Sequence, residues 1–116
     1  MRSLRATFRD IGCVTIVDLT GLLMLGNSIA VFRQAMSDLM ARQRSNIILN
    51  FRSVNGIDSA GVGEVIASFK AAKNQEGRLK LLHPPQGISD ILALTRLSNI
   101  MEIYSDEAAA VRSFES

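Results

Sequence analysis

The sequence contains few of the residues that build disulfides, metal clusters and aromatic cores. Its single cysteine, Cys13, excludes an internal disulfide and a cysteine-rich metal site. Cys13 opens the apolar run at residues 13–17, so we expect a small buried side chain rather than a reactive thiol. Aromatic residues make up only 5% and tryptophan is absent, so the core has to be built from aliphatic side chains.

Long apolar segments are missing as well. No stretch approaches the ~20 residues of a membrane-spanning helix, and no apolar segment follows residues 1–5 as it would in a signal peptide. We therefore expect a cytoplasmic protein that does not insert directly into a membrane.

The chain also lacks a large excess of charge of either sign. It has 13 basic and 11 acidic residues, and a net charge of +2 does not demand a polyanionic partner. Arg42 and Arg44 come closest to a cluster, but they stand where a helix is expected to end and cations offset the helix dipole. No aromatic residues interleave with them, so we expect no binding to nucleic acid.

The length and apolar content of the chain indicate a globular protein. The 116 residues, of which 47% are apolar, suffice for one domain with its own hydrophobic core. A disordered chain would contain fewer apolar residues. The sequence therefore predicts a single domain over residues 1–116, with no cofactor and no bound metal.

Hydrophobic periodicity alternates between strand-like and helix-like patterns along the chain. Strands are predicted over residues 4–10, 13–19, 46–51, 78–83 and 100–104. Helices are predicted from a cap at Asn27 or Ser28 to about Gln43, from just after Asp58-Ser59 to about Asn74, and over 86–94 and 108–114. The short link at Gly12 should make the first two strands antiparallel, whereas strands separated by helices should be parallel. The predicted fold is α/β: a small, mostly parallel sheet with one antiparallel edge strand, in the order strand–strand–helix–strand–helix–strand–helix–strand–helix.

Several residues mark the edges and ends of these elements. Arg5 and Arg9 suit a sheet edge, because charge there discourages pairing with other molecules. Asn27 or Ser28 can cap the first predicted helix. Two prolines after residue 83 end the fourth strand firmly.

Residues 56–63 are the segment that carries the most information. Three glycines among these eight residues indicate a tight turn or a close approach of the backbone. Asp58 and Ser59 stand where a helix starts, and their oxygens can accept hydrogen bonds from the N–H groups of its first turn. Plain helix capping is favoured for an arbitrary Asp-Ser pair by about four to one.

Catalytic interpretations of this segment fail on spacing. A phosphate-binding Walker loop needs a lysine that is absent here, and a dinucleotide loop needs a different order of glycines. A nucleophile elbow needs glycine two positions before the serine, where Ile57 stands. His83 is the only histidine and fits a polar strand terminus better than a catalytic base for Ser59. We expect no enzymatic activity.

The segment at 46–61 consists of an apolar strand, a short loop and the sequence Asp58-Ser59-Ala60-Gly61 at a helix start. It resembles the core motif of the STAS family, the sulfate transporter and anti-sigma factor antagonist domains. Residues 77–81, 92–97 and 103–104 resemble the family in the same order, so the similarity covers nearly the whole chain. The resemblance implies a STAS fold and the function of an anti-sigma factor antagonist.

The resemblance also implies a switch at Ser59. An anti-sigma factor serine kinase would phosphorylate Ser59, Asp58 would help to present the hydroxyl, and a metal-dependent serine phosphatase would remove the phosphate. The unphosphorylated protein would bind the kinase and release a sigma factor, with Ala60, Gly61 and Val62 completing the contact. A phosphate adds about two negative charges, which a helix N-terminus tolerates, so we expect it to block docking without refolding the domain.

The chain departs from the family near this site. Asn50-Phe51 stands where Asp-Leu is common, and Leu22 follows Gly21 where many phosphorylated members have an acidic residue. Both changes remove negative charge close to the expected switch.

The apolar run at residues 22–25 lends itself to two interpretations. Leu22, Leu23 and Met24 could form a docking surface beside the switch, or the run could fold over the end of the core. The sequence favours neither.

Other functions stay open. STAS-like domains also serve as non-switching scaffolds of sensory assemblies and as accessory subunits of transporters, where Asp58 and Ser59 would be a cap or a passive contact. The identity of the kinase and the existence of a weak homodimer are not determined by the sequence. A small hydrolase is disfavoured by the missing elbow and the single histidine.

Overall fold

The structure is a computed structural model that describes residues 3–94, 96 and 100–115. Five strands and four helices are found in this part of the chain. The strands are β1 (Arg5–Ile11), β2 (Val14–Leu23), β3 (Asn46–Ile57), β4 (Arg78–Leu82) and β5 (Ile103–Tyr104). The helices are α1 (Asn27–Ala41), α2 (Ser59–Asn74), α3 (Gln86–Leu94) and α4 (Glu107–Arg112).

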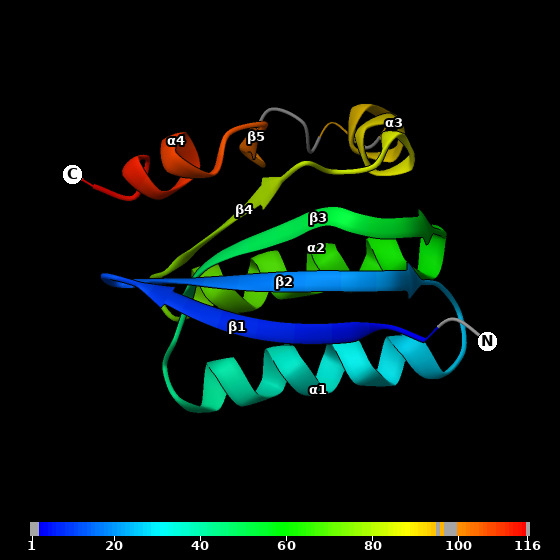
Figure 1. Ribbon diagram of the computed structural model, residues 1–116, viewed down its shortest axis with the longest axis horizontal. Coiled ribbons are helices and arrows are strands. Elements are labelled where there is room, and N and C mark those ends of the chain that lie inside the picture. Colours follow the sequence, from blue (N-terminus) through cyan, green and yellow to red (C-terminus); the bar gives the residue numbers. More distant parts are fainter. Residues whose placement is uncertain (1–2, 95, 97–99, 116) are drawn as a thin grey trace.

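The strands form one sheet in the order β1-β2-β3-β4-β5. β1 pairs antiparallel with β2, and every later pair is parallel, which confirms the predicted fold class. Helices α1 and α2 lie against one face of the sheet (Figure 1). Because β2 and β3 are parallel, the C-terminal end of β3 and the start of α2 lie at the same end of the sheet as the C-terminal end of β2.

The two faces of the sheet bury hydrophobic clusters of different size. The larger cluster joins the sheet to α1, α2 and α3, and includes Phe32, Val65 and Ile88. The smaller one lies under α4, where Ala110 and Phe114 pack with four residues of the sheet: Val14, Ile16, Ile48 and Leu82. Because successive strand residues point to opposite faces, β2 and β3 contribute to both clusters.

Two strands are longer than predicted. β2 continues to Leu23, beyond its predicted end, and β3 continues to Ile57 through the predicted loop at 52–56. The two extensions pair with each other, from Thr20 opposite Ser53 to the last residues of both strands, with one shift of register just before Thr20 and one after Gly21. Polar side chains on the solvent-facing side of β3 look like loop residues in the sequence, and this is why the prediction was wrong.

Cys13 is exposed, so the prediction of a buried thiol is wrong. With Gly12 it forms the two-residue turn between β1 and β2, where Ile11 pairs with Val14. Gly12 has φ 60, a left-handed conformation that two-residue hairpin turns require. Strand β2 therefore begins at Val14, one residue after the start of the apolar run.

Neither of the two predicted residues caps α1. Gly26 occupies the N-cap position, without a side-chain hydrogen bond. The Ser28 hydroxyl instead donates to the carbonyl oxygen of Met24 at 2.6 Å and accepts from its N–H at 3.0 Å. Arg44, which follows α1, forms an ion pair with Asp10 of β1 at 3.3 Å, so this cation links the segment after α1 to the edge strand of the sheet.

The C-terminal elements are shorter than predicted. β5 is limited to Ile103–Tyr104, which pairs with the last two residues of β4. α4 ends at Arg112, although Phe114 still packs into the smaller cluster as expected. Thr95 and Leu97, which belong to the family-like stretch at 92–97, lie outside the described residues.

A buried lysine anchors α4 to the sheet. Only 2% of Lys80 is exposed, and its ammonium donates to the carbonyl oxygen of Ser113 at 3.1 Å and to the Ser113 hydroxyl at 2.9 Å. Glu102 lies 3.3 Å away, and the ring centroid of Phe114 is 4.5 Å from the ammonium. A buried charge has to be paired. Because Ser113 is the C-cap residue of α4, the same hydrogen bonds also cap the C-terminal end of this short helix.

Truncating this anchor should destabilise the protein. We expect Lys80→Ala to lower the free energy of unfolding by about 2–4 kcal/mol, because it removes buried methylenes and leaves Ser113 without its charged partner. Lys73→Ala is the matched control: that lysine is exposed, 5.9 Å from the Phe69 ring centroid, and its loss should change stability by no more than about 0.5 kcal/mol. Urea unfolding of both variants checks this, and equal losses would contradict it.

Candidate functional site

Asp58 forms the junction between β3 and α2. It occupies the N-cap of α2, and its Oδ1 accepts a hydrogen bond from the Gly61 N–H at 2.9 Å. Its Oδ2 accepts a second bond, at 2.8 Å, from the N–H of Leu25. These two bonds, that of Leu25 first, hold the pKa of Asp58 below its usual range, so the carboxylate is charged at neutral pH. The predicted capping role of Asp58 is confirmed.

Ser59 is the first residue of α2, and its side chain is exposed. Within the described part of the chain its hydroxyl has no hydrogen-bond partner. The next residues turn inward: Ala60 is half-buried, and Gly61 and Val62 are buried. The exposed part of the predicted site is therefore Ser59, with Asp58 and Ala60 at its sides.

The apolar run at residues 22–25 is divided between the core and the surface. Leu22 and Leu23 end β2, and Leu23 is completely buried in the larger cluster. Met24 and Leu25 follow in the turn before α1, with exposed fractions of 37% and 82%. The run therefore both folds over the core and presents apolar surface, and only its second half is available to a partner.

The end of β2 and the first turn of α2 approach each other closely. A Cβ atom at Gly61 would overlap the carbonyl oxygen of Leu23 and would lie 2.8 Å from Cγ1 of Ile57. The Asp58 N–H points to the same carbonyl oxygen, at 3.4 Å. Glycine at position 61 is therefore needed for this contact, which brings the turn at Met24 and Leu25 beside Ser59.

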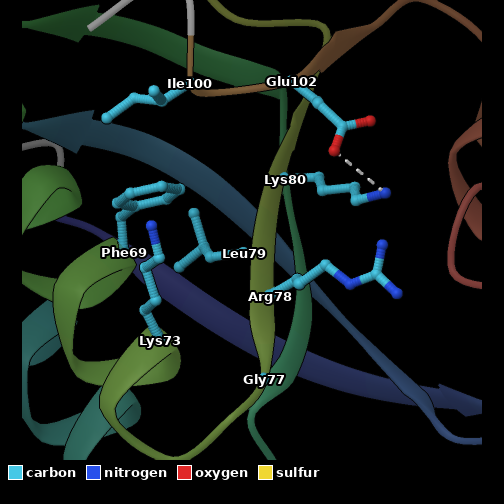
Figure 2. Close-up of a pocket in the computed structure, with 8 residues that line it drawn as sticks. All are labelled: Phe69, Lys73, Gly77, Arg78, Leu79, Lys80, Ile100 and Glu102. Atoms are coloured by element: carbon cyan, nitrogen blue, oxygen red, sulfur yellow. Dashed lines mark ion pairs between the residues drawn. The ribbon is translucent and has the colours of Figure 1, made fainter.

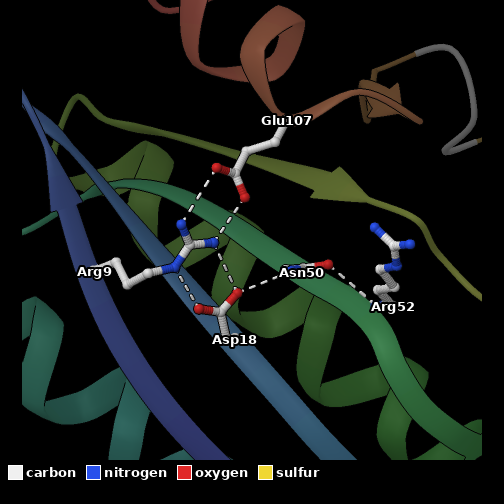
Figure 3. A network of polar contacts seen from close by, with 5 residues as sticks. All are labelled: Arg9, Asp18, Asn50, Arg52 and Glu107. Carbon is white, nitrogen blue, oxygen red and sulfur yellow. Dashed lines mark hydrogen bonds and ion pairs between the residues drawn. The ribbon is translucent and has the colours of Figure 1, made fainter.

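A network of polar side chains on the other face of the sheet has a structural role. The Arg9 guanidinium binds Asp18 and Glu107, and the side-chain amide of Asn50 donates to Asp18 at 2.8 Å (Figure 3). Hydrogen bonds from Arg9, and then from Asn50, lower the pKa of Asp18. The network joins β1, β2 and β3 to the start of α4, with the single cation of Arg9 shared between the two carboxylates of Asp18 and Glu107.

This network accounts for one of the departures from the family. An aspartate in place of Asn50 would set a second carboxylate against Asp18, whereas the amide donates a hydrogen bond to it. Sequence reasoning missed the network because Arg9 and Glu107 are 98 residues apart and no local pattern connects them.

A pocket of about 160 Å³ lies at the edge of β4, toward the C-terminal end of α2. Phe69, Lys73 and Leu79 line one side of it, whereas the side chains of Arg78 and Lys80 leave β4 on the other side, where the Lys80 ammonium pairs with Glu102 (Figure 2). It is smaller than the sites that usually enclose small-molecule ligands, and it includes no residue of the Asp58–Ser59 junction.

His83 and the acidic residues were checked for a serine–histidine pair and a metal cluster in the described residues 3–94, 96 and 100–115. No hydrogen bond connects His83 to Ser59 there, and no group of three or more His, Cys, Asp or Glu side chains could hold a metal ion. His83 directly follows β4, and its N–H donates to the carbonyl oxygen of Tyr104 at 2.9 Å. No helix in this part of the chain is long and apolar enough to cross a membrane.

Comparison with known proteins gives a consistent result. The sequence model of the STAS domain matches residues 6–110. An anti-sigma F factor antagonist from Paenibacillus polymyxa is 28% identical over 102 residues, covering 88% of this chain and 87% of that protein.

Two solved structures share the fold. An anti-sigma factor antagonist from Mycobacterium paratuberculosis superposes with a TM-score of 0.83 at 17% identity, covering 98% of this chain and 96% of that one. The Bacillus cell fate determinant SpoIIAA in its phosphorylated form has a TM-score of 0.76 at 22% identity, covering 94% and 99%. The likeness confirms the predicted fold.

Two glycines of α2 test the close approach at the site. Gly61→Ala should lower the free energy of unfolding by about 1–3 kcal/mol, because the methyl group would push the helix off β2. Gly63→Ala should instead raise it by up to about 1 kcal/mol, since nothing lies within 4 Å of a Cβ there and alanine favours the helix. Urea unfolding measures both, and a stabilising Gly61→Ala would refute the contact.

Proposed function

Since this chain belongs to the STAS domain family, we propose that it is an anti-sigma factor antagonist: a binding protein, not an enzyme, that is switched by phosphorylation of Ser59. Without phosphate it binds an anti-sigma factor serine kinase, and a sigma factor is released. With phosphate it does not bind. A metal-dependent serine phosphatase acting on the phosphorylated Ser59 returns the protein to its binding state.

The exposed, unengaged hydroxyl of Ser59 is the observation that supports this proposal most directly. A kinase has to reach the hydroxyl oxygen, which forms a bond to the γ-phosphorus of ATP while the bond to ADP breaks and the hydroxyl proton passes to a base of the kinase. An exposed serine at the first position of a helix meets that requirement. The N–H groups of the first turn favour the resulting anion, so the helix need not unfold.

The partner-binding surface that we propose surrounds this serine. It combines the side chains of Ser59 and Ala60 with the exposed turn of Met24 and Leu25. Leu23 and Val62, which the sequence analysis also expected in the contact, lie beneath this surface in the core, as does the backbone of Gly61. Leu22 is half-buried. Its Cδ2 atom would lie 3.2 Å from a Cβ atom at Gly56.

Phosphorylation opposes docking on this surface for an electrostatic reason. A phosphate at neutral pH carries about two negative charges, and a partner that covers the start of α2 would have to remove water from it. The ionised Asp58 next to it adds a like charge. Apolar surface such as Leu25 contributes to binding only when the partner comes close enough to exclude water.

A non-switching role as a scaffold or a transporter subunit is the alternative. It is favoured by the hydrogen bonds of Asp58, which give the Asp-Ser pair a structural reason without any modification. The two functions differ in whether a charge at position 59 changes binding.

Affinity capture from a lysate of the source organism separates them. Unphosphorylated wild type should retain a kinase-like ATPase, and Ser59→Asp should lose at least about 90% of it, a tenfold change in binding. The matched control is Ser105→Asp, which adds the same charge just before the N-cap of α4 and should bind like wild type. Equal partners on all three baits would contradict the switch and favour the scaffold or transporter subunit.

A further inference from the structure

The outer edge of β1 presents backbone groups that no other strand covers in residues 3–94, 96 and 100–115. β1 is the first strand of the sheet and pairs there only with β2. The two-residue turn makes Ile11 and Val14 a hydrogen-bonded pair, and such pairs alternate with pairs that exchange no hydrogen bond. The N–H and C=O groups of Ala6, Phe8 and Asp10 therefore point away from β2, where a further strand could bind them.

An open groove runs along this edge. Ala6 and Phe8 line it from β1, and Ala30, Val31 and Gln34 line it from α1, around a volume of about 480 Å³. Phe8 stands at the middle of β1, and 38% of it is exposed. A strand added to β1 would place every second side chain in the groove, so this edge combines main-chain hydrogen bonds with apolar contact.

The charge that should protect this edge is partly engaged elsewhere. From the sequence we expect Arg5 and Arg9 to discourage pairing. The Arg9 guanidinium instead lies over the sheet, bound to Asp18 and Glu107, and these three residues have two carboxylates for one cation (Figure 3). Arg5 is exposed and forms no ion pair within the described part of the chain. The same face of β1 therefore carries an unpaired cation and, four residues further on, a cluster with an excess of negative charge.

These features complement one another when two copies of the chain meet. In an antiparallel pairing centred on Phe8, the two Phe8 residues lie opposite each other and Ala6 lies opposite Asp10 of the second copy. A shift of two residues would leave the outward groups of Ala6 or Asp10 without a β1 residue opposite. Arg5 lies diagonally across from Arg9 of the second copy, where a long side chain can reach the cluster with the excess carboxylate.

Helix α1 favours a second copy over a single extended peptide. It packs against both β1 and β2, and two strands span about 10 Å, which is the distance between packed helices. In the joined sheets, α1 of the second copy would therefore lie beside the first α1 and close the groove over Phe8. The border of the groove carries the uncharged Ala30 and Gln34, with Asp38 at one end and far from its counterpart, since the two helices would run antiparallel. A lone strand would leave the groove open.

We propose that β1 is a dimer interface, at which two copies of the chain join their sheets through antiparallel pairing centred on Phe8. One pair of strands and one pair of helices make a small interface, so the dimer is transient and depends on concentration. The proposal is independent of the proposed function, because Ser59 follows β3, and β2 separates β3 from the interface. A dimer built in this way presents two copies of the Asp58–Ser59 junction.

Sedimentation equilibrium of the full-length protein tests this interface. Wild type should be a monomer at about 1 μM and mostly a dimer at about 1 mM. Phe8→Glu sets two carboxylates against each other at the centre of the interface and should weaken the dimer at least about tenfold. Ala6→Pro removes an outward N–H without removing a hydrogen bond to β2, and it should weaken the dimer by about tenfold as well. Circular dichroism checks that both variants are folded.

Ile103→Glu is the matched control. It makes an apolar residue of β5, 42% exposed, into a glutamate at the opposite edge of the sheet, and it should dimerise as wild type does. A wild type that stays monomeric at about 1 mM would overturn the proposal, as would a dimer that Phe8→Glu and Ile103→Glu weaken equally. A monomer whose Phe8 amide signal shifts only when cell lysate is added would assign the edge to an extended segment of another protein, and this too would overturn the dimer.

Discussion

The close approach of the Leu23 carbonyl to the first turn of α2 is the contact on which the candidate site depends. It requires glycine at position 61, and it brings the end of β2, the N-cap Asp58 and the following turn together. Because β2 and β3 pair up to Leu23 and Ile57, the C-terminal ends of both strands lie next to this contact. Ser59 is exposed there because the residues on either side of it are engaged in that contact or in the core.

The two faces of the sheet have different roles in the molecule. One face carries α1, α2 and the site, while the other is closed by α4, which Lys80 and the Arg9 network attach to the sheet (Figures 1 and 3). On this second face Arg9 pairs with Asp18 and Glu107, and Lys80 pairs with Glu102, so these electrostatic interactions stabilise the fold. The exposed hydroxyl and the exposed apolar turn lie at the junction on the first face, where a partner can reach them.

The sequence was sufficient for the fold class, because apolar periodicity indicates the elements along the chain, and the connections between strands indicate which are parallel and which antiparallel. The order of the strands across the sheet comes from the structure. The sequence also located Asp58 and Ser59 at a helix start. It did not reveal that β3 runs to Ile57, since an exposed strand face resembles a loop. The division of residues 22–25 between core and surface could not be predicted either, because it follows from how β2 pairs with β3 rather than from the apolar run itself.

The most direct test of the account is the mass of the protein recovered from its own cells. Intact-mass measurement and peptide fragmentation should find a fraction of the molecules with one phosphate, located on Ser59, and a strain that carries Ser59→Ala should lack it. The account would be contradicted by a protein that is unmodified in every growth phase, or by a phosphate that maps to another residue and persists in the Ser59→Ala strain.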